Sequence, residues 1–200
     1  MQPKVPNKDL LNAGLALMAQ NGMPLERTES KGRAMIYRTA AGESIRVRTC
    51  NDHVLVAVAS SPNKNATLNI EGTDKLLVVM PEVARMKGPV VAFLVPTDVA
   101  VEAVRSTHLE WLASNPATHG KNQTWNIWFD EDAPSKANGY MKKWAQYRLK
   151  GAASTDIKAR ISSDSNRPGS LGDVISDAKR RIAEAAGVPE TAVKITLDLT

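Results

Sequence analysis

Two short, uninterrupted apolar runs restrict the folds open to this chain more than any other feature of the sequence. Residues 76–80 and residues 90–95 contain only apolar side chains, and Lys87-Gly88-Pro89 precedes the second run. A strand that is apolar at every position has both faces buried, and Gly and Pro favour a turn before it. We therefore predict that these runs are two paired strands in the interior of a sheet.

The sequence around these runs predicts a mixed α/β (α+β) fold in which a mixed central sheet is flanked by helices. Asn7 can cap a first helix that ends at Gly22, and Thr97 or Asp98 can cap a second one. The expected helices are residues 7–22, 99–113, 135–149 and 171–186. The expected further strands are residues 34–38, 44–49, 53–59, 124–129 and 193–199, of which the first three form an antiparallel meander.

The length of 200 residues suits one domain with an appendage. We predict an α/β domain over residues 1–150, a linker rich in small and polar residues over 151–169, and a C-terminal helix-strand appendage over 170–200. The alternating strand at the end of this appendage can add to a sheet edge of a partner or of a second copy. A homodimer is therefore one expected assembly.

Composition narrows the location and the partners of the protein. No apolar window approaches the length of a membrane span, and the N-terminal residues lack the basic-then-apolar order of a signal peptide. The single cysteine, Cys50, fits a reducing compartment. We expect a cytoplasmic protein without a membrane partner, and the net charge of +5 favours an anionic one.

Three arginines alternate with apolar residues on two neighbouring strands of the expected meander: Arg38, Arg46 and Arg48. One interpretation is that they form the solvated side of a half-buried sheet. The other is that they converge on one face, where their mutual repulsion favours a bound anion such as phosphate. In the second interpretation Lys31 and Arg33 lie at the rim of the same nucleic-acid-binding surface.

The order of helix, three-strand meander, two interior strands and helix over residues 7–113 resembles the restriction-endonuclease-like, or PD-(D/E)xK, superfamily. In that family one meander strand carries an acid, and the next carries an acid, any residue and a lysine, often in a segment such as I-x-V-K-T. The corresponding segment here is Ile45-Arg46-Val47-Arg48-Thr49. Arg48 then stands at the lysine and Arg46 at the acid, while Arg38 stands where the preceding strand would carry its acid.

Guanidinium groups cannot ligate a cation, so the resemblance implies a nuclease-like framework without a catalytic or metal site and without a cofactor. We predict a catalytically inactive module that binds nucleic acid, DNA in particular, or regulates a DNA-handling protein. One alternative is a metal-dependent endonuclease that uses Glu29, Glu43 or Asp52. A further alternative is a protein-binding adaptor or inhibitor whose basic residues face an acidic partner.

Aromatic residues cluster in the second half of the expected first domain. Tyr140, Trp144 and Tyr147 share one helical face and are interleaved with lysine and arginine. This pattern is typical of a core-facing stripe, although such residues can also stack on unpaired bases. The four tryptophans between residues 111 and 144 predict one aromatic cluster against the sheet. The three histidines and Cys50 do not have the spacing of a zinc site.

Overall fold

The computed structural model describes residues 3–28, 35–63, 65–118, 123–132 and 138–156, together with the single residues 179, 183, 192 and 194. The chain divides into two units, Met1–Asp156 and Ile157–Thr200. Apart from the four single residues, the expected C-terminal helix and strand lie outside the described residues. The same holds for Glu29, Lys31 and Arg33.

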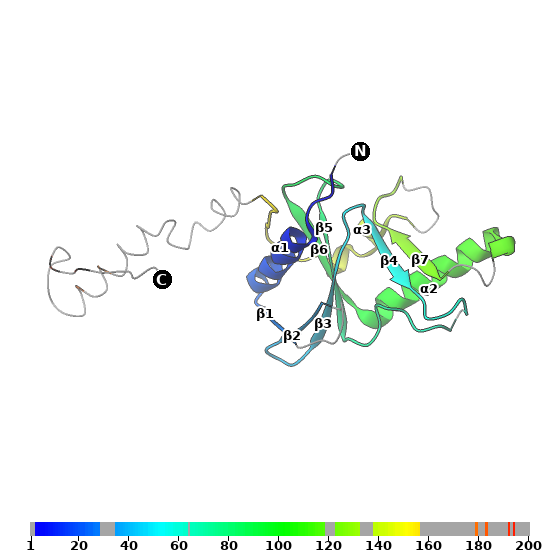
Figure 1. Ribbon diagram of the computed structural model, residues 1–200, viewed down its shortest axis with the longest axis horizontal. Helices are drawn as coiled ribbons and strands as arrows, with labels where there is room; N and C mark the ends of the chain where they lie inside the picture. The colour runs from blue at the N-terminus through cyan, green and yellow to red at the C-terminus, as the bar shows by residue number, and fades with distance from the viewer. Residues whose placement is uncertain are drawn as a thin grey trace. The chain divides into compact units, whose positions relative to one another are not determined.

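A mixed five-stranded sheet forms the centre of the first unit (Figure 1). In spatial order its strands are β1 (Leu25–Arg27), β2 (Ile36–Thr39), β3 (Ser44–Thr49), β5 (Lys75–Pro81) and β6 (Val90–Pro96). The neighbouring pairs are antiparallel except for β3 and β5, which run parallel. The predicted pairing of the two apolar runs is confirmed, because they are β5 and β6.

Strand β6 stands last in the sheet, but its outer edge is not bare. The N–H of Leu149 donates to the carbonyl oxygen of Ala92 at 2.9 Å, and the N–H of Val90 donates to that of Ala153 at 3.0 Å. The chain at residues 148–154 therefore runs along β6 and pairs with the outward backbone groups of Val90 and Ala92. Residues 151–156, expected to belong to a linker, thus contact the sheet and belong to the first unit.

The prediction of a three-strand meander is wrong in its third strand. Residues 54–58 do form a strand, β4 (Val54–Val58), but it pairs antiparallel with β7 (Thr124–Trp128) in a separate two-stranded sheet. A strand has only two edges, and those of β3 are taken by β2 and β5. After the turn at residues 50–53 the chain therefore leaves the central sheet, and β3 and β4 diverge.

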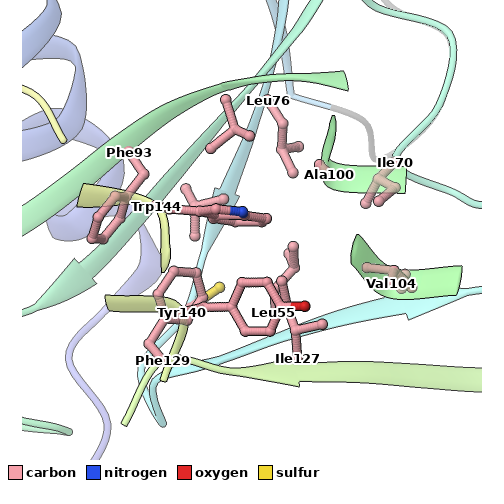
Figure 2. Close-up of a cluster of buried hydrophobic side chains, with 14 of the residues drawn as sticks. Leu55, Ile70, Leu76, Phe93, Ala100, Val104, Ile127, Phe129, Tyr140 and Trp144 are labelled. Atoms are coloured by element: carbon pink, nitrogen blue, oxygen red, sulfur yellow. The ribbon is translucent and has the colours of Figure 1, made fainter. Parts of the chain in front are cut away.

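Both faces of the central sheet are covered, which explains the uninterrupted apolar runs. Helix α1 (Asn7–Gln20) covers one face, and β4, β7 and α2 (Thr97–Ser114) lie on the other (Figure 1). Leu77 and Val79 point toward α1, whereas Leu76 and Val78 point into the second core. Figure 2 shows that second core, where side chains from both sheets and from α2 meet.

The helices differ from the expectation mainly at their ends. Asn7 and Thr97 are the first residues of α1 and α2 rather than caps, since Pro6 and Pro96 hold the N-cap positions and neither helix has a side-chain cap. A proline before a helix presets the backbone angle and has no N–H to satisfy. No helix of the described residues is both long and apolar enough to cross a membrane.

The expected helix over residues 135–149 is much shorter than predicted. Of the described residues in this range, Tyr140–Lys143 form α3, and a 3₁₀ turn follows at Ala145–Tyr147. Gly139 precedes α3 in a left-handed conformation with φ of 74°, so no helix passes through it. Arg148 then pairs with Phe93 in an isolated β-bridge, which keeps the following chain extended along β6.

Candidate anion-binding site

The sheet register places Arg38, Arg46 and Arg48 on the same face of the central sheet. Ile36 lies opposite Arg46, and Arg38 lies opposite Ser44, so these side chains project to one side. Tyr37, Ile45 and Val47 project to the other side and pack in the core beneath α1. The arginines therefore face away from α1, toward the side on which β4 and β7 lie.

Arg38 is set apart from the other two arginines. It is exposed and lies at the hairpin between β2 and β3, where it donates to the carbonyl oxygen of Gly42 at 3.5 Å. Its charge also acts on Asp74: hydrogen bonds from Ser44 hold the pKa of that carboxyl below its ordinary value, and Arg38 adds to the effect. Arg38 thus belongs to the polar surface at the hairpin.

Arg46 is held in a partly buried position. Its Nη2 donates to the carbonyl oxygen of Glu71 at 3.1 Å, while its Nε is buried and has no hydrogen-bond partner among the described residues. Burial lowers the pKa of Arg46, and the neighbouring charge of Arg48 lowers it further. A buried donor without a partner costs roughly 1–3 kcal/mol, so the Nε of Arg46 is a site where a bound acceptor would be favourable.

Arg48 spans the gap between the two diverging strands. Its Nη2 donates to the carbonyl oxygen of Val56 on β4 at 2.7 Å. The backbone groups of Val58 form hydrogen bonds with Asn69 on the edge of β4 that faces away from β7. Residues two apart on a strand direct their backbone groups to the same edge, so the carbonyl of Val56 also points away from β7. Arg48 therefore connects the outer edge of β4 to β3.

Arg46 and Arg48 line a pocket of about 280 Å³ between β3 and β4. The β4 side of the pocket has the apolar side chains of Val54 and Val56, and Leu55 between them also lines it. The other described residues that line it are Asn7, Met35, Val47, Thr49 and Cys50. The described lining therefore contains two cations and no carboxylate.

No carboxylate of the described part of the chain forms an ion pair with Arg46 or Arg48. Glu71 offers Arg46 only its backbone carbonyl, because its carboxylate lies 2.9 Å from Nη2 of Arg105. The sequence predicted charge on this face, but it did not predict the pocket. The pocket depends on the departure of β4 from the sheet, which no local pattern in residues 44–58 indicates.

The carboxylates of the alternative endonuclease hypothesis do not form one site. Glu43 pairs with Lys75 at 2.7 Å, whereas Asp52 pairs with Lys4 at 3.1 Å and with Arg85. Glu43 and Asp52 flank opposite ends of β3. Within the described ranges no group of three or more histidine, cysteine or acidic side chains is arranged to hold a metal ion. Glu29 lies outside these ranges.

The aromatic stripe belongs to the core rather than to a surface. Tyr140 and Trp144 are buried in the second core with their ring centroids 5.1 Å apart (Figure 2). Tyr147 is partly buried and packs against the same cluster. Trp125 is buried as well and stacks on His108 at 4.2 Å. The buried rings of Tyr140 and Trp144 cannot receive a base, so the prediction that these residues face the core is confirmed, although one continuous helix does not carry them.

No protein-family model matches the chain, and neither a curated protein nor a solved structure shows significant similarity to it. The resemblance to the restriction-endonuclease-like superfamily therefore stays a prediction.

Proposed function

We propose that this chain is a non-catalytic module that binds phosphate groups of nucleic acid in the pocket between β3 and β4. The observation that carries the proposal is the pair Arg46 and Arg48, which line one pocket without a carboxylate partner among the described residues. Two like charges held side by side and partly removed from water are unfavourable. A bound anion would compensate both of them.

Phosphate suits these two side chains for geometric reasons. A guanidinium presents several N–H groups in a plane, and its hydrogen bonds to phosphate oxygens are charge-assisted, worth roughly 1.5–3 kcal/mol each. The N-terminal residue of α1, Asn7, also lines the pocket. The partial positive charge at a helix N-terminus favours an anion nearby.

In this proposal Arg46 and Arg48 stand at the positions that the resemblance assigns to the acid and the lysine of a nuclease. They would contact the phosphate directly, without a bridging metal ion. The proposal does not depend on the resemblance, because it rests on the charges and the lining of the pocket. It is narrower than the surface expected from the sequence, since Arg38 lies outside the pocket.

Fluorescence anisotropy with a labelled single-stranded oligonucleotide tests the proposal. We expect Arg46→Gln and Arg48→Gln each to weaken binding at least tenfold, the loss of one charge-assisted hydrogen bond or more. If the two arginines neutralise two negative charges of phosphate, the logarithm of affinity should fall with the logarithm of salt concentration at a slope of about −1.4.

Arg38→Gln is the matched control, because it removes an arginine from the same sheet face but outside the pocket. Its affinity should stay close to that of the unmodified chain. If all three variants lose the same amount of affinity, the binding site is a diffuse basic surface rather than the pocket. Unchanged binding in the double variant Arg46→Gln/Arg48→Gln, with an unaltered circular dichroism spectrum, would refute the proposal.

A further inference from the structure

We propose that the pocket between β3 and β4 selects a terminal phosphate, the phosphate monoester of a nucleotide, over an internal phosphodiester. The nucleotide can be free or can stand at the end of a strand, since the recognised chemistry is the same. This inference rests on the proposed function and specifies the substrate class of that site.

The first argument is the match of charge. The pocket has two guanidinium groups, and its described lining has no acidic side chain to offset them. A phosphate monoester carries a charge of about −1.5 to −2 near neutral pH, whereas a phosphodiester carries a single negative charge. Only the monoester can neutralise both arginines with one phosphate group.

The second argument is the shape of the site. Strands β3 and β4 are consecutive in the chain, joined by the turn at residues 50–53, and they diverge into different sheets. The turn closes one end of the space between them, and Cys50 from this turn lines the pocket. An internal phosphodiester needs two exits for its two substituents. A terminal phosphate needs only one.

Arg48 narrows the site further, because its guanidinium crosses from β3 to the carbonyl of Val56. A continuous strand would have to pass over this link, whereas a chain end can enter beside it. The hydrogen bond to Val56 also fixes the guanidinium plane before a ligand arrives. Such preorganisation lowers the entropy lost on binding.

The third argument is the apolar wall of the pocket. Val54 and Val56 are half-buried and project from the same face of β4, whereas Leu55 projects from its other face into the second core. Pockets for drug-sized ligands begin at about 300 Å³, so a volume of about 280 Å³ has room for a small group such as a phosphate with its sugar. The wall therefore suits the sugar or base that carries the phosphate.

The test compares oligonucleotides of one sequence that differ only at the 5′ end, measured with the full chain. The three probes have a 5′-phosphate, a 5′-hydroxyl and a 5′-phosphate capped as its methyl ester. The methyl ester keeps the phosphate in place but leaves it one negative charge. We expect the 5′-phosphate to bind about tenfold more tightly than either of the others, as an added charge-assisted contact predicts.

The preference should disappear in Arg48→Gln and persist in Arg38→Gln. Competition with a nucleoside 5′-monophosphate then shows whether the terminal phosphate of a free nucleotide or that of a strand end is the ligand. Displacement of the labelled strand at comparable concentrations identifies a free nucleotide as sufficient, and displacement only by a second 5′-phosphorylated strand identifies the strand end. Either result supports a terminal phosphate as the ligand.

The outcomes also separate this inference from the proposed function. If all three probes bind equally well and binding still requires Arg46 and Arg48, phosphate binding stands and terminal selectivity is refuted. The same conclusion follows if a covalently circular oligonucleotide binds as tightly as the 5′-phosphorylated one. If no probe binds to the folded chain, the proposed function fails, and this inference fails with it.

Discussion

Nδ1 of His53 lies 2.7 Å from a carboxylate oxygen of Asp130, and Nε2 of the same ring lies 2.7 Å from the carbonyl oxygen of Pro81. His53 is buried and adopts a left-handed conformation with φ of 52°. Pro81 ends β5 in the central sheet, and Asp130 follows β7 in the second sheet. The imidazole therefore links the two sheets at the turn where β3 and β4 diverge.

This link predicts that His53→Ala lowers the free energy of unfolding by about 2–4 kcal/mol. The variant loses the contact with the Asp130 carboxylate and the contact with the buried carbonyl of Pro81. Alanine is also less favourable than histidine at positive φ. Urea denaturation measures the change. Asp132→Asn is the control, because Asp132 is exposed on the loop that carries Asp130, and this variant should be about as stable as the unmodified chain. A loss below about 1 kcal/mol would show that the link contributes little.

The contact between α1 and β5 predicts a strong effect of Gly14→Ala. A Cβ atom at Gly14 would clash with Cγ2 of Val79, whose branched side chain has little freedom to move. Overpacking of this kind destabilises a protein by about 1–3 kcal/mol. The higher helix propensity of alanine stabilises it by about 1 kcal/mol, so we expect Gly14→Ala to lower the free energy of unfolding by up to about 2 kcal/mol.

The clash can be relieved from the other side. In a thermal or urea denaturation series, Gly14→Ala/Val79→Ala should be more stable than the sum of the two single changes implies, by about 0.5–3 kcal/mol. Additive effects would mean that the two residues do not compete for the same space.

The ion pairs of Asp52 predict a pH dependence of stability. The hydrogen bond from Arg85, with a smaller one from Lys4, lowers the pKa of the Asp52 carboxyl in the folded chain. The folded pKa lies below the unfolded value of about 3.9, so this stabilisation is complete above that value and is lost as the pH falls through the folded pKa.

Asp52→Asn should therefore be less stable than the unmodified chain near pH 7, and the difference should shrink toward pH 2–3. Chemical denaturation at a series of pH values measures this. A difference that stays constant from pH 7 to pH 2 would assign the effect to packing rather than to charge.

Cys50 should be unreactive in the folded chain. Burial raises the pKa of its thiol to about 12, even though the charge of Arg48 acts in the opposite direction. Since the thiolate is the reactive form, a disulfide reagent such as dithionitrobenzoate should modify Cys50 only as fast as the chain opens. Rapid labelling under native conditions, at a rate close to that in urea, would contradict this.

The central strands were predictable because their apolar content leaves few alternatives. Residues 76–80 and 90–95 are apolar at every position, so only a position covered on both faces suits them, and they form β5 and β6. The common face of the two arginines of β3 was predictable for a different reason: side chains alternate along a strand, so residues two apart share one face. Local pattern was sufficient for both.

The pocket was not predictable, because it depends on which strand edges are free. The sequence of residues 53–59 predicts a strand, but not that the parallel neighbour β5 occupies the edge of β3 that β4 would need. The short α3 has a similar origin. Its extent is decided by the left-handed Gly139 and by the bridge from Arg148 to Phe93, and the local helical pattern of residues 135–149 shows neither.

The hydrogen bond from Arg48 to Val56 has a consequence for self-association. The outward backbone groups of Val58 are paired with Asn69, and the outward carbonyl of Val56 is paired with Arg48. Unpaired edge groups can recruit a strand of another molecule, and a charged side chain laid across the edge opposes such growth. We therefore expect that replacing Arg48 leaves this carbonyl open to another molecule and increases the self-association of the protein.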